Sequence, residues 1–231
     1  MSADPADKLG AFLKKLGKKF GEQGGVRATD LFPDERLIAD SITNEIVVSM
    51  LIWESSFSHA AKAFERIRSD LVDLNELRVC TGDELMSIMG TRMPRSSERA
   101  LRLLSILNTV YERENMLELA HLREMNKRDV LAYLSGIDGL PQYAIARVLL
   151  LELGLHAIPL DERLSKKLVG ESVLDSSQTL EQQASVLERA VRANDSLETY
   201  RLLEHWGQES RTVTKSRKST KSTPATKGAS S

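Results

Sequence analysis

The segment from residue 127 to residue 163 places the strongest constraint on how this chain can fold. It reads as a helical pattern, KRDVLAYLSGI, a turn at DGLP, a second helical pattern, QYAIARVLLLELG, and a lone aspartate in PLDER. Glycine and proline interrupt helices, so the sequence predicts two helices joined by a short turn. The first N–H groups of the second helix lack partners within the helix, and together with the helix dipole they attract an anion. A DNA phosphate fits such a site, but a plain packing corner between helices explains the pattern as well.

Helix-type spacing continues through most of the chain after Pro33. The stretch EIVVSMLIW at 45–53 is too apolar for a surface helix, which predicts a central buried helix. Thr81 and Glu84 in TGDELMSIMG form a capping-box pattern, and this helix should end at Gly90. Because no alternating strand pattern interrupts these segments, the predicted fold class is all-α.

The two ends of the chain differ from its middle in charge. The net charge is −1, but residues 211–231 hold six basic residues and no acidic one, which leaves 26 basic against 33 acidic residues in the first 210. The start of the chain carries a helical apolar stripe with lysines beside it, which predicts a helix that docks on the body or acts as a membrane-surface or partner-binding arm. We therefore expect a basic amphipathic helix and linker at 1–27, a helical domain at 28–210 and a disordered basic tail at 211–231.

The composition argues against metal, cofactor and membrane sites. Cys80 is the only cysteine, so no disulfide, four-cysteine iron–sulfur cluster or cysteine-based zinc finger is expected. The four histidines are scattered, and we expect neither a metal nor another cofactor. No run of eighteen apolar residues occurs and the first twenty residues lack a secretory signal pattern, which predicts a cytoplasmic protein without a membrane partner, nucleoid-associated if bacterial.

The turn and the aspartate together resemble a known motif. IDGLPQYAI, ARVLLLELG and AIPLDERLSKKL align without gaps with the hairpin (LPGVGxxTA), the second helix and the aspartate-bearing segment of the helix-hairpin-helix, GPD-type (endonuclease III-like) DNA glycosylases. VVSMLIWESSFSHAAKAF resembles the buried helix and the DNA-inserting loop of that family, and MPRSSERALRLL resembles the start of its helix before the hairpin. The resemblance covers about residues 37–207 and implies a two-lobed all-α fold, without the iron–sulfur cluster of some members.

The resemblance implies that Asp161 is the catalytic residue and that Tyr143 occupies the hairpin position of the lysine in bifunctional members. Tyrosine forms no imine, so Schiff-base lyase chemistry by that route is excluded. Base excision requires that the target nucleotide leave the duplex, after which Asp161 would stabilise positive charge on the sugar and orient or deprotonate a water, with Tyr143 lining the pocket. The residues alone also allow simpler roles, a helix N-cap for Asp161 and a core aromatic for Tyr143.

The resemblance also implies which residues meet DNA, and this chain departs from the family there. The expected contacts come from the hairpin turn, the loop after the buried helix and nearby basic side chains: Gly139, Leu140, Pro141, Gln142, Glu54, Ser55, Arg95, Arg99, Arg163 and Lys166. Pro141 lacks an N–H donor, Gln142 stands where relatives often have a basic residue, and Glu54 carries a charge of the wrong sign for DNA.

The favoured hypothesis is a monomeric, monofunctional DNA glycosylase that hydrolyses the N-glycosidic bond of a damaged or mismatched base. Its partner would be double-stranded DNA, bound through backbone phosphates and a flipped base. The alternative is a non-catalytic family member that binds DNA or a protein, and a weaker one is a helical interaction protein without DNA binding. An Asp161 carboxylate open to a cleft favours the enzyme, whereas one that caps a helix in a closed corner favours the binder.

Overall fold

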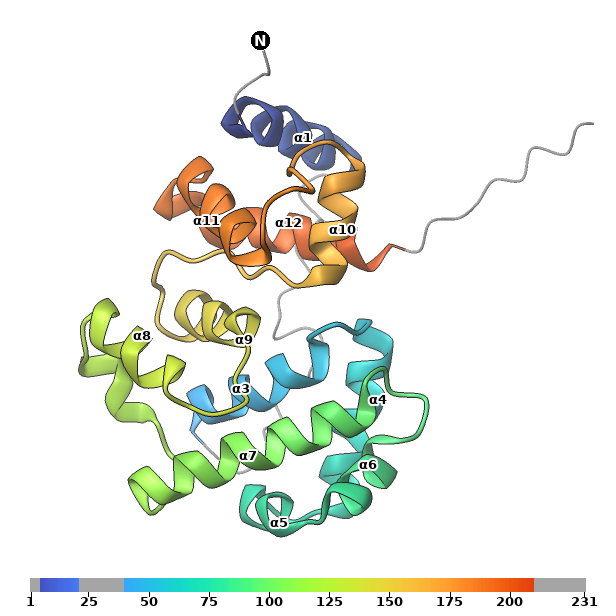
Figure 1. Cartoon of the computed structure of the whole chain (residues 1–231), viewed down its shortest axis with the longest axis vertical. Coiled ribbons are helices and arrows are strands. Elements are labelled where there is room, and N and C mark those ends of the chain that lie inside the picture. Colours follow the sequence, from blue (N-terminus) through green and yellow to red (C-terminus); the bar gives the residue numbers. More distant parts are fainter. Residues whose placement is uncertain (1–4, 21–39, 210–231) are drawn as a thin grey trace, which may run out of the picture.

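The computed structural model describes residues 5–20 and 40–209, which fold into two helical lobes (Figure 1). The first lobe contains α3 (Ser41–Ile52), α4 (Phe57–Asp70), α5 (Leu74–Val79), α6 (Gly82–Met89), α7 (Ser96–Glu114), a 3-10 turn (Ala120–Glu124), α8 (Lys127–Ser135), α9 (Gln142–Arg147) and a π-helical turn (Val148–Glu152). The second lobe contains α1 (Pro5–Phe20), α10 (Glu162–Gly170), α11 (Leu180–Ala190), a 3-10 turn (Ala193–Asp195) and α12 (Ser196–Gln208). The predicted all-α, two-lobed fold is confirmed.

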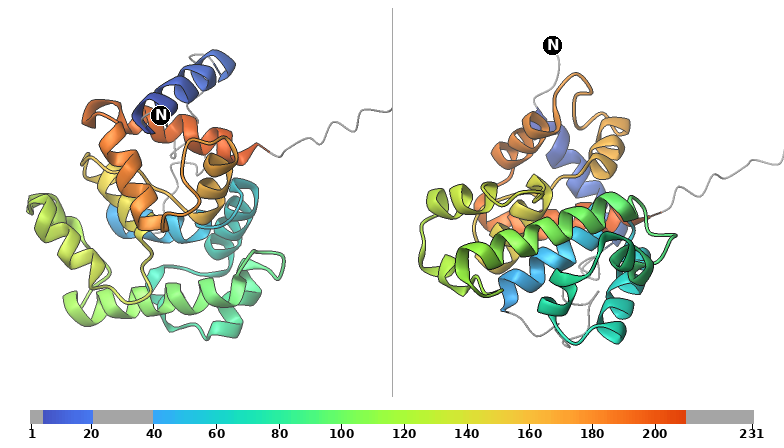
Figure 2. Two further views of the ribbon diagram at one scale, coloured as in Figure 1. Left: turned by 45° about the horizontal axis from the view of Figure 1, so that its top comes forward. Right: turned by 60° about the horizontal axis from the view of Figure 1, so that its bottom comes forward.

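Helix α3 is the centre of the first lobe. Asp40 caps its start, because its carboxylate accepts a hydrogen bond from the backbone N–H of Ile42 at 2.8 Å. Ile46, Met50 and Leu51 are fully buried, and burying a side chain of this kind contributes about 1.5–3 kcal/mol. Helix α7 runs beside α3 across the lobe (Figure 2). The apolar run at 45–53 therefore forms the central helix that the sequence predicts.

Helix α1 belongs to the second lobe although it comes first in the chain. Its apolar stripe, Leu9, Phe12 and Leu16, is buried against α11 and α12. The Phe12 and Trp206 rings meet edge to face with their centroids 4.9 Å apart. Within the predicted N-terminal segment, the structure has a helix that lies docked on the second lobe. The predicted linker beyond Phe20 and the predicted tail at 211–231 lie outside the described residues.

The helical hairpin of α8 and α9 lies at the junction of the lobes (Figure 1). Gly139 in its turn has φ of +82°, and a Cβ there would lie 3.3 Å from the Arg102 carbonyl oxygen, so the position favours glycine on two counts. Beyond α9 and the π-helical turn, the chain reaches α10, whose first residues lie against the loop between α3 and α4. None of the helices in the described part of the chain combines the length and apolar character needed to cross a bilayer.

Candidate functional site

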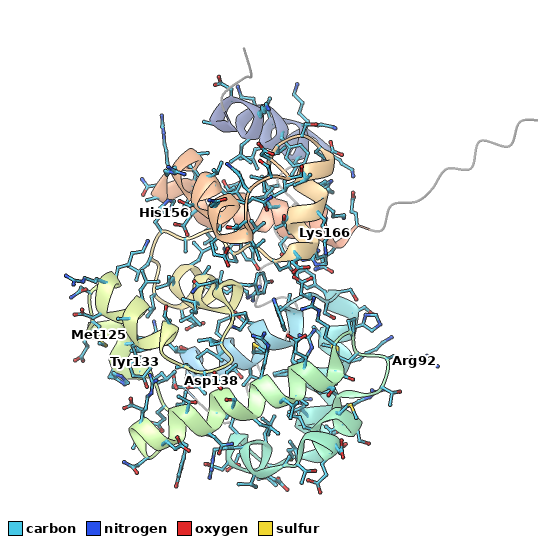
Figure 3. The ribbon with its side chains drawn as sticks, viewed as in Figure 1. Arg92, Met125, Tyr133, Asp138, His156 and Lys166 are labelled. Carbon is cyan, nitrogen blue, oxygen red and sulfur yellow. The ribbon has the colours of Figure 1, made fainter. Side chains whose placement is uncertain are left out.

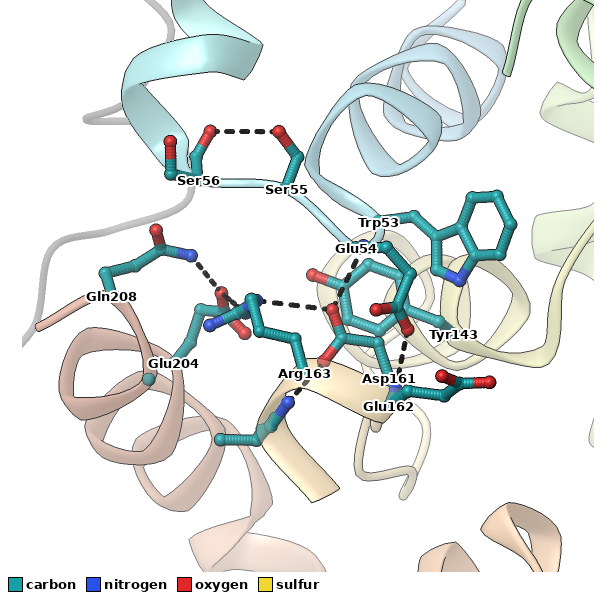
Figure 4. Close-up of polar contacts among 12 residues, drawn as sticks. Trp53, Glu54, Ser55, Ser56, Tyr143, Asp161, Glu162, Arg163, Glu204 and Gln208 are labelled. Carbon is teal, nitrogen blue, oxygen red and sulfur yellow. Dashed lines mark hydrogen bonds and ion pairs between the residues drawn. The ribbon is translucent and has the colours of Figure 1, made fainter. Parts of the chain in front are cut away.

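Asp161 lies in a closed corner between the lobes (Figure 4). It is the N-cap of α10: one carboxylate oxygen accepts a hydrogen bond from the Leu164 N–H at 2.8 Å. The other oxygen accepts from the backbone N–H of Glu54 at 3.1 Å and lies 3.4 Å from Nε of Arg163. The residue is 0% exposed. The carboxylate therefore has neither an oxygen nor a face available to solvent.

Glu54 closes this corner from the first lobe. It follows α3 by two residues with φ of +52°, an unfavourable value for a residue with a side chain. Its N–H binds Asp161, and its carboxylate accepts a hydrogen bond from the Glu162 N–H at 2.6 Å. Partial burial raises the pKa of Glu54, and the neighbouring Asp161 charge raises it further. These two reciprocal hydrogen bonds, which we call the Glu54 clasp, join the α3–α4 loop to the start of α10.

Arg163 fills the other side of the corner. Its guanidinium donates to Glu204 at 2.6 Å, and the same Glu204 oxygen accepts from the Gln208 side chain at 2.7 Å. Gln208 in turn accepts from the Phe57 N–H at 2.9 Å, which ties α12 to the start of α4. Burial opposes the charge on Arg163, but Glu204 and Asp161 outweigh it and raise the Arg163 pKa. Arg163 thus acts as an internal partner for two carboxylates.

Tyr143 is also buried, with its hydroxyl 3.2 Å from that of Tyr200. Burial raises the pKa of Tyr143 well above its usual value. Arg147, one turn later on α9, donates to the Tyr200 hydroxyl at 2.5 Å and to the Glu45 carboxylate at 2.8 Å. Ser49 on α3 completes this group, since it donates to Glu45 at 2.7 Å and accepts from Arg147. Sequence analysis missed this network, although a charge inside each of two apolar runs was a signal that both are buried and paired.

The hairpin turn is the part of the predicted site that reaches the surface. Gln142 is exposed at the start of α9, while Gly139, Leu140 and Pro141 are half-buried. Pro141 is the N-cap residue and makes no side-chain capping bond. Ser55, in the loop of Glu54, is buried, and its hydroxyl lies near Met93.

The predicted basic residues do not form one exposed strip. Arg99 is fully buried. Its guanidinium donates hydrogen bonds to the carbonyls of Met50 and Trp53 at the end of α3, and to the carbonyl of Pro94. The expectation that Arg99 lies on a DNA-facing surface is therefore wrong. Desolvation, together with the nearby Arg95 charge, lowers the pKa of Arg99 to about 10.

The exposed basic groups have acidic neighbours. Arg95 lies 3.5 Å from Glu98 and 4.0 Å from Glu162, and Lys166 lies 2.9 Å from Glu162. The positive charge on this rim is consequently balanced within the protein. Figure 3 shows Lys166 on α10 and Arg92 at the outer edge of the first lobe.

A cavity of about 250 Å³ lies on another side of α9, between α8 and α11. Leu131, Ala146 and Leu149 are among its apolar lining residues, whereas Asp161, Tyr143 and Glu54 are not part of its lining. Among the described residues, no group of three or more histidine, cysteine or acidic side chains is arranged to hold a metal ion.

Solved structures resemble this fold along nearly its whole length. An endonuclease III trapped as a covalent intermediate on DNA aligns with a TM-score of 0.66 at 11% identity, over 89% of this chain and 86% of that one. The H. pylori 3-methyladenine DNA glycosylase bound to 1,N6-ethenoadenine aligns with a TM-score of 0.58 at 13% identity, over 89% and 95% of the two chains. A thermostable thymine-DNA glycosylase aligns with a TM-score of 0.55 at 14% identity, over 92% and 90%.

The sequence matches no family model and no curated protein. At 11–14% identity, the structural likeness establishes the fold, which is the helix-hairpin-helix DNA glycosylase fold that the hairpin and Asp161 predict.

Proposed function

We propose that this protein binds duplex DNA through the surface of its helical hairpin and does not excise a base. One observation carries the second half of this proposal: Asp161 is fully buried, and both of its oxygens are engaged inside the protein. The glycosylase fold and the exposed start of α9 support the first half.

Base excision needs room that this corner does not contain. The target nucleotide must leave the duplex and enter a pocket, where a carboxylate faces the sugar. Here Glu54, Arg163 and Tyr143 fill the space around Asp161, and each is held by its own hydrogen bonds. A flipped base would have to break the Glu54 clasp and expose a buried ion pair, which is costly when one charge is left without its partner.

The charges on the surface predict weak and salt-sensitive binding. Non-specific DNA affinity comes mainly from basic side chains that neutralise phosphates. Glu98 and Glu162 already balance the basic groups on the rim, and Pro141 has no N–H to donate at the hairpin. We therefore expect the hairpin to position DNA, and the salt-sensitive part of the affinity to come from the six basic residues at 211–231.

Monofunctional base excision by Asp161 is the second candidate. It is favoured by one observation, namely that Asp161 and Tyr143 converge on the same interlobe corner, eighteen positions apart as in the family motif. In that case DNA binding must separate the lobes at the Glu54 clasp. Tyr143 would then line the opened pocket, and no imine would form.

One experiment distinguishes the two candidate functions. The purified full-length chain is incubated in excess with duplexes carrying uracil, a G·T mismatch, an alkylated base or an oxidised base, and the products are treated with alkali. The same duplexes are titrated at low salt by fluorescence anisotropy. Binding without strand breaks supports the proposal, whereas breaks that disappear in Asp161→Asn establish the glycosylase.

A pair of matched variants tests the hairpin surface. Gln142→Glu adds a negative charge at the exposed start of α9, while Gln182→Glu makes the same change at the exposed start of α11. Repulsion between carboxylate and phosphate should weaken DNA binding by Gln142→Glu alone. Equal effects of the two variants would contradict the proposed surface.

A further inference from the structure

Trp53 lies under a group of guanidinium cations beside the Glu54 clasp. The guanidinium carbons of Arg95, Arg99 and Arg102 lie 5.2, 5.8 and 5.0 Å from the centroid of its indole ring. The residue is only 8% exposed, and it also belongs to the apolar core of the first lobe. Attraction between a cation and the face of an indole stabilises such an arrangement.

In the described part of the chain, only Arg95 among these three arginines has an exposed guanidinium that makes no hydrogen bond to a backbone carbonyl. Its side chain is 41% exposed, and the acidic groups within ion-pair distance are Glu98 and Glu162. Arg99 is instead buried against backbone carbonyls, and Arg102 donates to the Gly139 carbonyl at 3.2 Å. Of the three arginine side chains, that of Arg95 is therefore the most exposed, at 41% against 37% for the Arg102 side chain.

The backbone around this stack is strained. Arg95 is the N-cap residue of α7 with φ of +52°, and it makes no side-chain capping bond. Glu54, directly after Trp53, has φ of +52° as well. Both conformations are unfavourable for residues with side chains, and such residues concentrate at binding sites. Both residues adjoin Trp53, because Glu54 follows it in the chain and the Arg95 guanidinium lies over its ring.

We propose that Arg95, supported by Trp53 beneath it, is a stacking platform for an unpaired nucleobase, so that the protein prefers DNA with a bulged or unpaired base over fully paired duplex. This inference rests on the proposed DNA binding and specifies the form of DNA that is bound. Guanidinium planes and aromatic rings stack on bases only when the base is out of its pair. Because Arg102 joins this stack to the hairpin turn, one DNA molecule can reach both surfaces.

Charge favours a base over a phosphate at this position. The Glu98 and Glu162 carboxylates lie beside Arg95 and repel the DNA backbone. A nucleobase carries no net charge, so it can approach the guanidinium face without that repulsion. Stacking of one base changes affinity by roughly five- to a hundredfold.

The test compares a fully paired duplex with the same duplex carrying a single-base bulge. The full-length chain is used, with Arg95→Lys to keep the charge and remove the plane, and with Arg92→Lys as the matched control. Arg92 is exposed and lies three residues earlier, outside the Trp53 stack. We expect the wild type and Arg92→Lys to prefer the bulged duplex about tenfold, and Arg95→Lys to lose most of that preference.

A spectroscopic readout follows the stack directly. In a Trp206→Phe background, Trp53 is the only tryptophan, and its fluorescence should be quenched by the bulged duplex more than by the paired one. This measurement needs no change at Arg95, so it decides the matter if Arg95→Lys does not fold. Equal affinity for both duplexes, unchanged preference in Arg95→Lys or equal quenching would overturn the stacking platform alone. A lack of affinity for either duplex would overturn the proposed DNA binding, and the platform with it.

Discussion

Replacing Asp161 with asparagine distinguishes a structural role of this carboxylate from a catalytic one by its effect on stability. Asparagine caps helices about as well as aspartate, so the bond to the Leu164 N–H at 2.8 Å can be kept. The second oxygen cannot be replaced in the same way. In the wild type this oxygen accepts from the Glu54 N–H and pairs with the Arg163 guanidinium. The N–H₂ group of asparagine would face the same two donors and could accept from neither.

The expected loss follows from these two contacts. A hydrogen bond to a charged group contributes about 1.5–3 kcal/mol, and removing one partner of a buried ion pair costs about 3–5 kcal/mol. Arg163 keeps Glu204 as a partner at 2.6 Å, so only part of the free energy for breaking a buried ion pair is lost. We therefore expect Asp161→Asn to lower the free energy of unfolding by about 2–4 kcal/mol.

Urea unfolding at pH 7, followed by circular dichroism, measures this difference. Asp73→Asn is the control, because Asp73 caps α5 through the same bond to the third residue, Glu76, at 2.9 Å, without a buried ion pair. Its loss should stay below about 0.5 kcal/mol. If Asp161 were instead a catalytic carboxylate in an open, strained site, Asp161→Asn should leave the free energy of unfolding nearly unchanged or raise it. That result would refute the closed corner.

Three further predictions follow from the charges. Burial and Asp161 raise the pKa of Glu54 above the ordinary 4.5, so ionised Glu54 destabilises the fold at neutral pH and this cost disappears as the pH falls toward 4.5. Glu54→Gln should therefore be more stable than wild type at pH 7, by less than about 1 kcal/mol because the group is half exposed, and equal to it near pH 4 in urea titrations. Arg147→Met strands Glu45 and should cost about 3–5 kcal/mol, while adding Glu45→Leu should restore most of it; a double variant no better than the single one would contradict the pairing. Deleting residues 211–231 removes six basic residues and should reduce the slope of log affinity against log salt by at least about 1, whereas an unchanged slope would show that the tail does not meet phosphates.

Local signals in the sequence were sufficient for the elements of the fold. The Thr81 and Glu84 capping box is present at the start of α6, and Gly90 ends that helix with φ of +92°. These features depend on residues a few positions apart, so the sequence predicts them without knowledge of the tertiary structure. The glycosylase fold was predicted from the gapless resemblance of the hairpin and the Asp161 segment to a known family, since the residues alone allowed a plain packing corner.

The direction of individual side chains was not available from the same signals. Arg99 and Arg163 look like surface cations in a helical pattern, yet both turn inward, because carbonyls at the end of α3 and the Glu204 carboxylate accept from them. Glu54 was expected to face DNA and instead binds the start of α10. Each of these contacts joins residues more than forty positions apart, and helical periodicity carries no information about such pairs.

Amide hydrogen exchange at Glu54 and Glu162 tests the closed corner most directly. The Glu54 N–H is bonded to buried Asp161, and the Glu162 N–H is bonded to the Glu54 carboxylate. If the corner stays closed, both amides exchange slowly in the free protein and equally slowly when the protein is saturated with a duplex carrying an unpaired base. Loss of protection at both amides on binding this DNA would mean that the lobes open around Asp161, and would contradict the account.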